Sequence, residues 1–588
     1  MFAPPFVHAE RDAPNRVQVQ RPSVGPWPPQ LDWIHSKRHP RLDFTILEVR
    51  AAHRRNSGRC PQENLCPFPP ALGIVFAPVS AEHSRGAGVF RFPELLVAKQ
   101  QEEKKFITKR SENLSEWYVD VVLGCGLADY APVKGCMVIR PYGWAIWESV
   151  KEHLNARIIA TGHENAQFPL LIPESFLKKE AEHVEGFAPQ VAWVTVGGDE
   201  ELSEKLAIRP TSEAIICHMY SKWINSYRDL PVLINQWANI VRWEKKTKPF
   251  LRTTEFHWQE GHTAHRTHEE AQEEALKMLG VYKAFAEEDL AMAVLAGPKS
   301  DSEKFPGADT TYTIEAMMPD GKALQSGTSH DLGQHFAKGF DIKFLDDDNV
   351  EKYVWQTSWG ISTRIVGGLI MMHGDDAGLR LPPKVAPIQV VIVPIIFEKT
   401  KALVLEKAEM LAKALGRVEA FGKRLRVKLD ASEQQSPGWK FNQYEMMGVP
   451  LRIEVGPKDV ENESVKVVER VTGEKGFIPV NFDDLNFNPD EFVNRLEEAQ
   501  AKLRQASAAD LSARTIPVSS REEFEDVVCG NKGFALVNWG GGAAEEIEIK
   551  ERTSATLRVL LDPVESANME CFWSGRPARR RAVFAQSY

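Results

Sequence analysis

The stretch that most constrains the fold is Ile388 to Ile396, a nearly continuous apolar run broken only by one Gln and one Pro. Such a run is typical of a strand that is buried on both faces. A helix rich in Lys, Glu, Leu and Ala is expected over Lys401 to Leu415, and further strands over Leu425 to Leu429 and Leu451 to Val455. This strand–helix–strand rhythm predicts a separate α/β domain over residues 387–489.

The preceding residues, 101–386, have a different pattern. Short strands and helices alternate there without a βαβ rhythm, which predicts an α+β domain with an antiparallel or mixed sheet. We expect this domain to begin with a charged helix over Lys99 to Glu116 and to contain a helix over Trp144 to Leu154. After the α/β domain, a charged helix over Asp490 to Ala506 leads into a small C-terminal domain that completes residues 490–588.

Residues 1–100 differ from the rest in charge and proline content. They carry 13 Lys+Arg against 8 Asp+Glu, whereas the remaining residues carry 59 against 73, and they hold 14 of the 37 prolines. Proline at this density removes backbone donors and predicts a disordered extension or a presequence. Arginine enrichment is typical of organelle transit peptides, although Glu10 and Asp12 argue against one. We expect a plastid or mitochondrial location, with a cytoplasmic one as the alternative.

Composition excludes several classes of protein. The longest apolar runs are far shorter than the ~20 residues of a membrane span, which predicts a soluble protein with no membrane partner. Seven cysteines without a CxxC pair argue against a disulfide scaffold. The formal charge of −9 gives no indication of a nucleic-acid partner.

Two common site motifs are absent. No phosphate-binding P-loop of the form GxxxxGK[ST] is present. His262, His265 and His268 lie three residues apart, which is not the HExxH spacing that places two zinc ligands on one helical face. The spacing therefore favours a structural or substrate-contacting role over a metal site.

The first stretch that indicates chemistry has two arginines on either side of a lysine-rich segment. Arg242-Trp243-Glu244 and Arg252-Thr253-Thr254-Glu255 flank Lys245 to Pro249, which we interpret as a hairpin loop between two strands. Two paired strands with an arginine on each are able to clamp a triphosphate, because a planar guanidinium donates two hydrogen bonds per phosphate. A cross-strand ladder of salt bridges is an equally good interpretation.

The second stretch runs from Ser358 through Arg364 to Asp375 and contains the pair Gly367-Gly368. Its pattern predicts a strand that turns into a helix with an arginine at the junction. Taken alone, the pattern favours ordinary core packing with one surface arginine.

Together with four further motifs, these stretches resemble the class II aminoacyl-tRNA synthetases, and specifically the prolyl-tRNA synthetases. The motifs are Arg209-Pro210-Thr211-Ser212-Glu213, Trp258-Gln259-Glu260-Gly261-His262, Gln325-Ser326-Gly327-Thr328-Ser329-His330 and Pro437-Gly438-Trp439-Lys440-Phe441. The resemblance extends from about residue 105 to the C-terminus. In the sequence of its motifs, the chain is most similar to the archaeal-like type, which includes plant organellar members.

The resemblance implies a fold and a reaction. The fold is a class II antiparallel-sheet catalytic domain (101–386), an anticodon-binding domain (387–489) and a C-terminal domain of degenerate zinc type (490–588). The reaction is the activation of L-proline with ATP and Mg²⁺ and its transfer to tRNA(Pro) by a homodimer. A threonyl- or histidyl-type enzyme and a non-catalytic tRNA-binding paralogue are the alternatives.

The resemblance also implies site residues. Arg242, Arg252 and Arg364 would be catalytic through the phosphates, and Pro169 would lie at the dimer interface. The expected ATP contacts, with Mg²⁺ near Gln325, are Arg242, Glu244, Arg252, Thr253, Gln325, Thr328, Ser362 and Arg364. The expected proline contacts are Thr211, Glu213, Arg242, Trp258, Glu260, His262 and His330. A carboxylate suits proline's ammonium group, which is charged and carries two N–H donors.

Several features depart from the family. The 112-residue spacing from Arg252 to Arg364 leaves no room for the large editing insertion of bacterial-type enzymes. Of four zinc cysteines that relatives often carry, only Cys571 is present, so no zinc is expected. His257 replaces an apolar residue and is expected either to face solvent or to reshape the pocket edge.

The C-terminal residue and two basic segments are further candidates. The final Tyr588 matches a family residue whose carboxylate reaches toward the active site; a frayed tail is the alternative. A net charge sums over the whole surface, whereas tRNA binding needs only local basic patches. The candidate patches are Lys245 to Lys248 and Arg579 to Arg581, and for each of them a solvated face is the alternative.

Overall fold

The computed structural model describes residues 107–183, 191–563 and 569–588, all of which belong to one compact unit, Ala98–Tyr588. The predictions for residues 1–100 therefore lie outside the described residues. No helix within the described ranges has the length and apolar character needed to cross a membrane.

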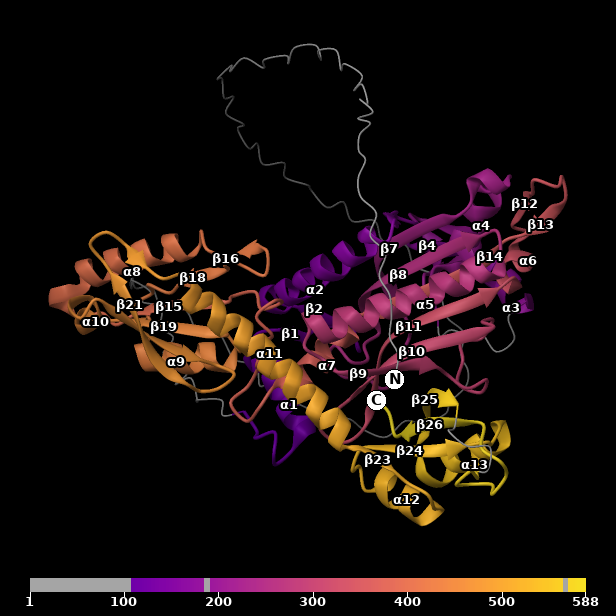
Figure 1. Cartoon of the computed structure of the whole chain (residues 1–588). Helices are drawn as coiled ribbons and strands as arrows, with labels where there is room; N and C mark the ends of the chain where they lie inside the picture. Colours follow the sequence, from indigo (N-terminus) through magenta and orange to yellow (C-terminus); the bar gives the residue numbers. More distant parts are fainter. Residues whose placement is uncertain (1–106, 184–190, 564–568) are drawn as a thin grey trace, which may run out of the picture. The chain divides into compact units, whose positions relative to one another are not determined.

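The first domain is built on a seven-stranded sheet (Figure 1). Its strands, in spatial order, are β3 (Glu164–Asn165), β7 (Val232–Val241), β8 (Glu255–His265), β14 (Trp355–Ser362), β11 (Ala323–Gly333), β10 (Thr310–Met317) and β9 (Val294–Pro298). All neighbouring pairs are antiparallel except β3 with β7. This arrangement confirms the α+β prediction for this domain.

Helix α5 (His268–Ala284) covers one face of this sheet (Figure 1). It begins at a capping box formed by Thr267 and Glu270, which satisfies backbone donors at its first turn. Tyr282 of α5 donates a 2.6 Å hydrogen bond to Gln259 on β8. The opposite face of the sheet is therefore the one that remains available for a site.

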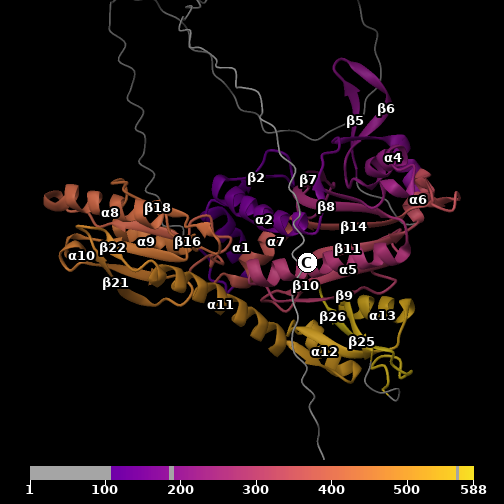
Figure 2. The same cartoon turned by 45° about the horizontal axis from the view of Figure 1, so that its top comes forward.

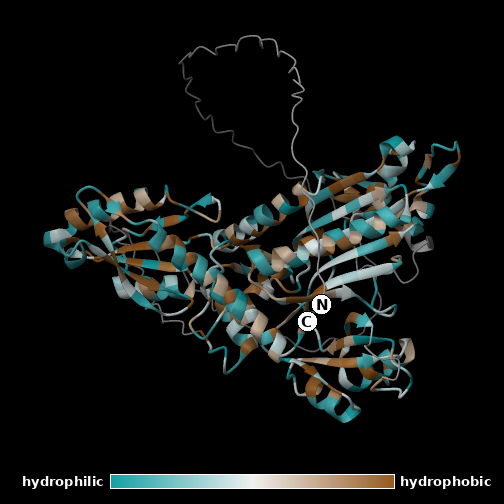
Figure 3. Ribbon diagram, viewed as in Figure 1, coloured by the Kyte–Doolittle hydropathy of each residue, from teal (hydrophilic) through white to brown (hydrophobic). Residues whose placement is uncertain are grey.

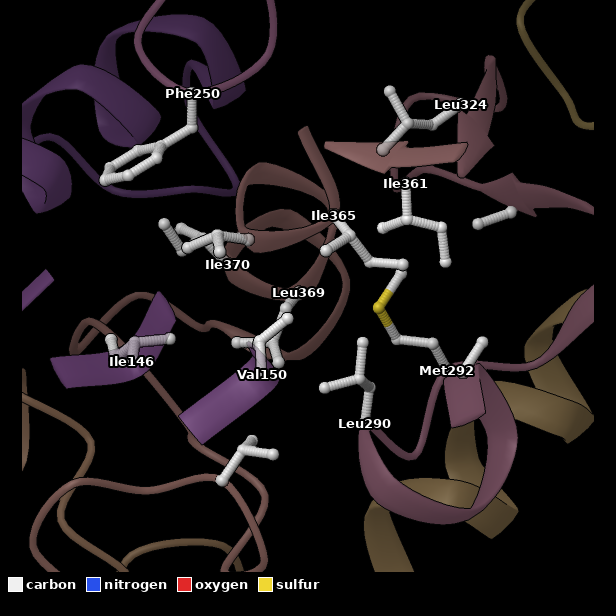
Figure 4. Close-up of a cluster of buried hydrophobic side chains, with 14 of the residues drawn as sticks. Ile146, Val150, Phe250, Leu290, Met292, Leu324, Ile361, Ile365, Leu369 and Ile370 are labelled. Carbon is white, nitrogen blue, oxygen red and sulfur yellow. The ribbon is translucent and has the colours of Figure 1, made fainter. Parts of the chain in front are cut away.

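Helix α7 (Arg364–His373) follows β14 directly, as the sequence predicts, and its apolar side chains anchor the end of the site. Ile365 and Leu369 are fully buried, and they pack with Val150 of α2 (Pro141–Ala160) and with Met292 in one core cluster (Figure 4). Burial of each such side chain contributes about 1.5–3 kcal/mol. The arginine that opens α7 thus projects from a rigid base.

The first helix, predicted over Lys99 to Glu116, is wrong over residues 107–113, and residues 99–106 lie outside the described residues. Residues 107–113 are not helical, and α1 spans Leu114–Gly124. The physical reason is Asn113, whose side chain accepts hydrogen bonds from the backbone N–H groups of Ser115 and Glu116 and so fixes the helix start there. The predicted helix over Trp144 to Leu154 is confirmed, as the middle of α2.

The second domain has a six-stranded sheet in the order β18-β15-β19-β20-β21-β22. Strand β15 (Val390–Pro394) is completely buried and pairs in parallel with β18 (Val427–Leu429) and β19 (Leu451–Val455). Helix α8 (Lys401–Leu415) makes the crossover and packs on β15. The central strands of this domain are coloured hydrophobic in Figure 3, in agreement with the βαβ prediction.

The remaining strands of that sheet, β20 (Ser464–Glu469), β21 (Lys475–Asn481) and β22 (Asn486–Phe487), are antiparallel. Helix α11 (Asp490–Ala513) then extends beyond the predicted end at Ala506. The C-terminal domain has a four-stranded sheet with two helices. Its elements are β23 (Thr515–Pro517), α12 (Arg521–Cys529), β24 (Phe534–Trp539), α13 (Ala543–Thr553), β25 (Thr556–Pro563) and β26 (Arg580–Ala585).

The C-terminal domain contacts the edge of the seven-stranded sheet, where β25 packs against β9 (Figure 2). Gly297 of β9 allows this approach, because a Cβ atom there would lie 2.7 Å from the carbonyl oxygen of Leu560. The backbone N–H of Ala323 on β11 also donates to the Gln586 carbonyl at 2.8 Å. The C-terminal strands and the residues that follow them therefore contact the strands β9 and β11 of the seven-stranded sheet.

Candidate active site

One cavity of about 260 Å³ on the open face of the sheet collects most of the predicted site residues. It is lined by Thr211, Glu213, Arg242, Trp258, Glu260, His262, Gln325, Thr328, His330, Ser362 and Arg364. The predicted residues Glu244, Arg252 and Thr253 do not line it.

Strand β8 forms one wall of this cavity, because its side chains point alternately to the two faces of the sheet. Phe256, Trp258, Glu260 and His262 are two residues apart and point to the same face, as successive even positions of a strand do. Gly261 lies on the opposite face, where a Cβ atom would meet the Trp359 ring at 2.1 Å. This close packing explains why the Trp-Gln-Glu-Gly-His motif needs a glycine at its fourth position.

Glu260 is the centre of a buried hydrogen-bond network. Its Oε1 accepts from Ser212 Oγ at 2.5 Å and from Gln236 Nε2 at 2.7 Å, while Oε2 lies 3.1 Å from His262 Nε2. Burial opposes ionisation of Glu260, but the hydrogen bonds from His262, Ser212 and Gln236 outweigh it and lower the pKa of Glu260.

The pKa of His262 is shifted in the opposite direction, upward. Burial opposes its protonation, but the hydrogen bond to Glu260 and the negative charge of Glu213 outweigh burial, so the pKa of His262 is raised. Both shifts favour the charged form of the group, a carboxylate for Glu260 and an imidazolium for His262.

Two further groups line the same cavity: the pair Thr211 and Glu213, and His330. Thr211 donates a short hydrogen bond to Glu213, and both side chains are buried. His330 shares a 3.0 Å hydrogen bond with Thr311, and burial together with the positive charges of Lys299 and His262 lowers the pKa of His330 to about 3. A neutral His330 imidazole therefore lines the cavity together with Glu213 and Trp258.

Arg242 lines the cavity and lies close to two aromatic rings. Its guanidinium carbon is 5.6 Å from the Phe256 ring centroid and 5.4 Å from that of Trp258. Its Nε donates to the Pro210 carbonyl at 2.9 Å, and its terminal nitrogens have no hydrogen-bond partner among the described residues. The aromatic faces hold the guanidinium in place while its two terminal nitrogens remain available to an anion.

Arg364, like Arg242, is held through its Nε by a backbone carbonyl. Its Nε donates to the Leu251 carbonyl at 3.0 Å, and within the described ranges no group pairs with its terminal nitrogens. Burial and the positive charges of Arg252 and Arg242 lower the pKa of Arg364 to about 10. A cluster of like charges that depresses a guanidinium pKa is a site prepared for a polyanion.

The structure adds residues that the sequence analysis missed. Lys299 follows β9, and its Nζ donates to Gln325 Oε1 at 2.8 Å inside the cavity. Thr311 and Phe305, which contact His330, line the cavity as well. The alternating polar residues of β10, Thr311, Thr313 and Glu315, are the signal that indicates a polar sheet face there.

The loop between β7 and β8 differs from its prediction. Neither Arg242 nor Arg252 lies on a strand, since β7 ends at Val241 and β8 begins at Glu255. The side chain of Arg252 is 50% exposed, and its Nε is 3.8 Å from Glu244. Only one of the two arginines that flank the loop therefore lines the cavity.

The three spaced histidines contact different partners. His262 contacts Glu260, His265 contacts Thr263 at 2.7 Å and His268 contacts Asp331 at 2.9 Å. Two side-chain groups among the described residues are close enough to share a metal, and neither contains a cysteine; they are His268 with Asp309 and Asp331, and Asp346 with Asp347 and Asp348. The absence of zinc stays a prediction.

His257 points away from the cavity. It packs edge-on against Trp144, with ring centroids 5.0 Å apart, and its backbone carbonyl accepts from Thr363 N at 2.8 Å. Partial burial lowers the pKa of His257. Of the two expectations for this residue, neither solvent exposure nor contact with the pocket matches its position.

Tyr588 is held against the catalytic domain. Its hydroxyl donates to Asp320 at 2.8 Å, and Lys248 Nζ lies 5.4 Å from its ring centroid and 5.1 Å from that of Tyr118. A frayed tail is therefore not what the structure has. Lys248, predicted to belong to a basic patch, is enclosed between two rings, whereas Lys245 and Lys246 are exposed.

Comparison with known families identifies the class of protein to which the antiparallel sheet and its cavity belong. Residues 193–373 match the family model described as tRNA synthetase class II core domain (G, H, P, S and T), and residues 389–499 match the model for the anticodon binding domain. The chain is thus a class II aminoacyl-tRNA synthetase by its core.

The particular family follows from two further comparisons. Residues 521–588 match the model for the prolyl-tRNA synthetase C-terminal domain. The chain is 55% identical to the proline–tRNA ligase of Natranaerobius thermophilus over 84% of this chain and 100% of that one, and 54% identical to that of Chlorobium chlorochromatii over 82% and 99%. The proline–tRNA ligase of Rubrobacter xylanophilus is 53% identical over 82% and 98%. The chain belongs to the prolyl-tRNA synthetase family.

Proposed function

We propose that this protein activates L-proline with ATP to prolyl-adenylate and then transfers the prolyl group to the 3′ end of tRNA(Pro). The observation that carries the proposal is one cavity lined both by Glu213 and a neutral His330 and by Arg242 and Arg364, whose terminal guanidinium nitrogens are free of hydrogen bonds to the described residues. This arrangement matches one substrate with an ammonium group and one with phosphates.

In the first step, a carboxylate oxygen of proline attacks the α-phosphorus of ATP in line, and the bond to the β-phosphate bridging oxygen breaks to release pyrophosphate. Glu213 holds the ammonium group, and Trp258 and His330 border the ring. Arg242 contacts the α-phosphate, while Arg364, Arg252, Thr328 and Ser362 contact the remaining nucleotide. Alignment supplies about 7–11 kcal/mol, and preorganised donors supply several more.

Mg²⁺ enters with ATP as part of the substrate, held mainly by its phosphates. The side-chain oxygens of Gln325 and Thr328, which both line the cavity, would contact the metal. Because Gln325 Oε1 already accepts from Lys299 Nζ, the lysine and the metal would share this end of the cavity. In the second step, the 3′-terminal ribose hydroxyl attacks the activated carbonyl and AMP leaves.

The test is proline-dependent ATP–pyrophosphate exchange followed by charging of a tRNA(Pro) transcript. Exchange with proline, but not with threonine or histidine, supports the proposal over the two neighbouring class II types. Binding of tRNA without any exchange would instead support the non-catalytic paralogue. The presence of all three arginines, Arg242, Arg252 and Arg364, favours the catalytic alternative.

We extend the proposal to alanine. Every element between Arg252 and Arg364 belongs to the sheet, its covering helices or the small hairpin of β12 (Lys343–Leu345) and β13 (Glu351–Tyr353). A missing methylene costs only about 1–3 kcal/mol in a pocket. We therefore expect measurable alanine activation without clearance by the enzyme itself. Hydrolysis of Ala-tRNA(Pro) by the pure protein would contradict this expectation.

A homodimer belongs to the same proposal. Pro169 is exposed and is followed by Leu170 (41% exposed) and Leu171 (38% exposed). Strand β4 (Leu171–Pro173) pairs with β6 (Glu200–Ile208), whose other neighbour β5 (Ala192–Gly197) presents an exposed Trp193. Such clustered exposed apolar side chains are typical of an interface. Light scattering after gel filtration tests this, and a monomeric mass at micromolar concentration would refute it.

A plastid or mitochondrial location completes the proposal, supported by the excess of basic over acidic residues in positions 1–100. Residues 1–100 fused to a fluorescent protein are expected to direct it to an organelle. Diffuse cytoplasmic fluorescence would favour the alternative.

A further inference from the structure

The polar face of β10 continues past the cavity to a fully buried carboxylate. Thr311, Thr313 and Glu315 alternate along the strand, and Thr313 donates to Glu315 Oε1 at 2.9 Å, which places their side chains on one face. Glu315 pairs in register with Gln325 on β11, and both Thr311 and Gln325 line the cavity. Glu315 therefore lies beside Gln325 of the cavity wall, with no exposed surface.

The cation that pairs with Glu315 comes from the C-terminal domain. Arg558 on β25 donates from Nη2 to both carboxylate oxygens at 3.1 and 3.0 Å and from Nε at 3.2 Å. The arginine side chain is 6% exposed and the glutamate side chain 0%. Within the part of the chain that the structure describes, Arg558 is the one cation in an ion pair with Glu315.

Backbone irregularities aim the two side chains at each other. The register between β25 and β26 shifts between Leu557 and Val559, so Arg558 is the extra residue of a bulge. The register between β10 and β11 shifts just before Glu315. Bulges redirect single side chains out of the regular ladder, and two of them meeting at one ion pair indicate a specific contact.

The neighbouring contacts between the domains hold Arg558 in place. Ser300, one residue after Lys299, donates to Glu546 of α13 at 2.7 Å. Together with the close approach of Gly297 to Leu560, this contact brackets the ion pair on the β9 side.

Glu315 acts electrostatically on the cations of the nucleotide site. Burial lowers the pKa of Lys299, and the negative charge of Glu315 opposes that effect; the same charge opposes the lowering of the pKa of Arg364. If Arg558 were absent, the buried carboxylate would lack its ion-pair partner and would draw on these two cations instead. Lys299 would then leave Gln325, and less positive charge would be available to the phosphates.

We infer that Arg558 of the C-terminal domain is a positioning residue for ATP: by neutralising Glu315, it leaves Lys299 and Arg364 free to bind the nucleotide phosphates. The inference rests on the proposed function. It makes the C-terminal domain a part of the ATP site rather than an appendage that contacts only tRNA.

The experiment compares Arg558→Met, Glu315→Gln and the double variant in ATP–pyrophosphate exchange with the full chain. Arg558→Met is expected to raise the KM for ATP by about tenfold or more, because an unpaired buried charge perturbs its neighbours strongly, while the KM for proline stays within about twofold. The double variant is expected to recover most of the ATP affinity, because the carboxylate that captures Lys299 is then neutral.

Two controls make the result specific. Arg576→Met removes a half-exposed arginine of the same domain, paired with Glu545, and is expected to leave both KM values unchanged. Arg558→Lys keeps the charge without the bidentate geometry and is expected to lie between wild type and Arg558→Met. Thermal unfolding of every variant reports whether the domains stay folded.

Two outcomes overturn the inference. One is an unchanged KM for ATP in Arg558→Met. The other is equal loss in kcat and both KM values with no recovery in the double variant, which identifies Arg558 as a brace between domains. Absence of exchange in the wild-type protein would instead overturn the proposed function, so the two failures are distinguishable.

Discussion

The residues proposed to bind proline (the proline end of the cavity) and those proposed to bind ATP (the nucleotide end) differ in how their polar groups are bonded. At the proline end, polar groups are already bonded to one another: Glu260 accepts from Ser212, Gln236 and His262, and Thr211 donates to Glu213. At the nucleotide end, Arg242 and Arg364 use only Nε for bonds to the described residues and keep their terminal nitrogens free. A satisfied network fixes shape and selects a small ligand, whereas unsatisfied cations require an anion.

The largest expected effect comes from the nucleotide end. Arg364→Ala and Arg242→Ala are each expected to lower kcat for ATP–pyrophosphate exchange by about 10²–10³-fold, because each removes preorganised donors to a charge that develops on phosphorus. Steady-state exchange kinetics measure this.

Arg252→Ala, which removes a half-exposed arginine outside the cavity, is also expected to lose exchange. Unchanged exchange in that variant would overturn the phosphate role that the resemblance implies for it. Arg228→Ala serves as the control, because Arg228 is exposed and its guanidinium lies against the neighbouring Tyr227, away from the cavity.

At the proline end, Glu213→Gln is expected to raise the KM for proline by about 10–100-fold, since a charge-assisted hydrogen bond contributes ~1.5–3 kcal/mol. The KM for ATP is expected to change little. Glu303→Gln, at another carboxylate that lines the cavity, is the matched control and should leave proline binding intact. A parallel rise in both KM values for Glu213→Gln would contradict the division of the cavity into two ends.

A smaller effect is expected on stability, and it depends on pH. The pKa of His262 is raised above 6.5 and that of Glu260 is lowered below 4.5, so their charged pair stabilises the fold fully between about pH 4.5 and 6.5, and this stabilisation disappears as the pH rises through the folded-state pKa of His262. His262→Gln should therefore lower the free energy of unfolding by about 1–3 kcal/mol in mildly acid solution and by less in alkaline solution. Denaturant titrations across this range would show a constant difference if His262 were neutral.

The smallest expected effect concerns exposed lysines of the loop between β7 and β8, which line neither end of the cavity. Lys245→Ala and Lys246→Ala remove exposed charges of the loop and should raise the KM for tRNA a few-fold. The slope of binding against salt should fall by about one for each phosphate that a lysine no longer neutralises. Proline activation without tRNA should stay unchanged. Lys248→Ala tests the contrast within the loop, because Lys248 is enclosed by Tyr118 and Tyr588 and is not available to a phosphate.

Much of the fold is predictable because local patterns agree with it. The apolar run of β15 indicates a strand buried on both faces, and the Gly pair after Arg364 marks a helix packed closely on its neighbours. Charge content alone places the first helix too early, because the side chain of Asn113 decides where that helix starts. The expectation of a short hairpin loop puts Arg242 and Arg252 on strands, yet both belong to the connection between β7 and β8.

For the candidate site too, some features are predictable from the sequence and others depend on the tertiary structure. The sequence by itself determined which residues could carry charge to a phosphate or an ammonium group, because the motifs are contiguous and strand alternation orders them. Only the tertiary structure decided that Gln236 completes the Glu260 network, that Lys299 bonds Gln325 and that Arg558 neutralises Glu315 across 243 residues. These pairs depend on sheet register and domain contact, and their energies arise from burial, which no local pattern encodes.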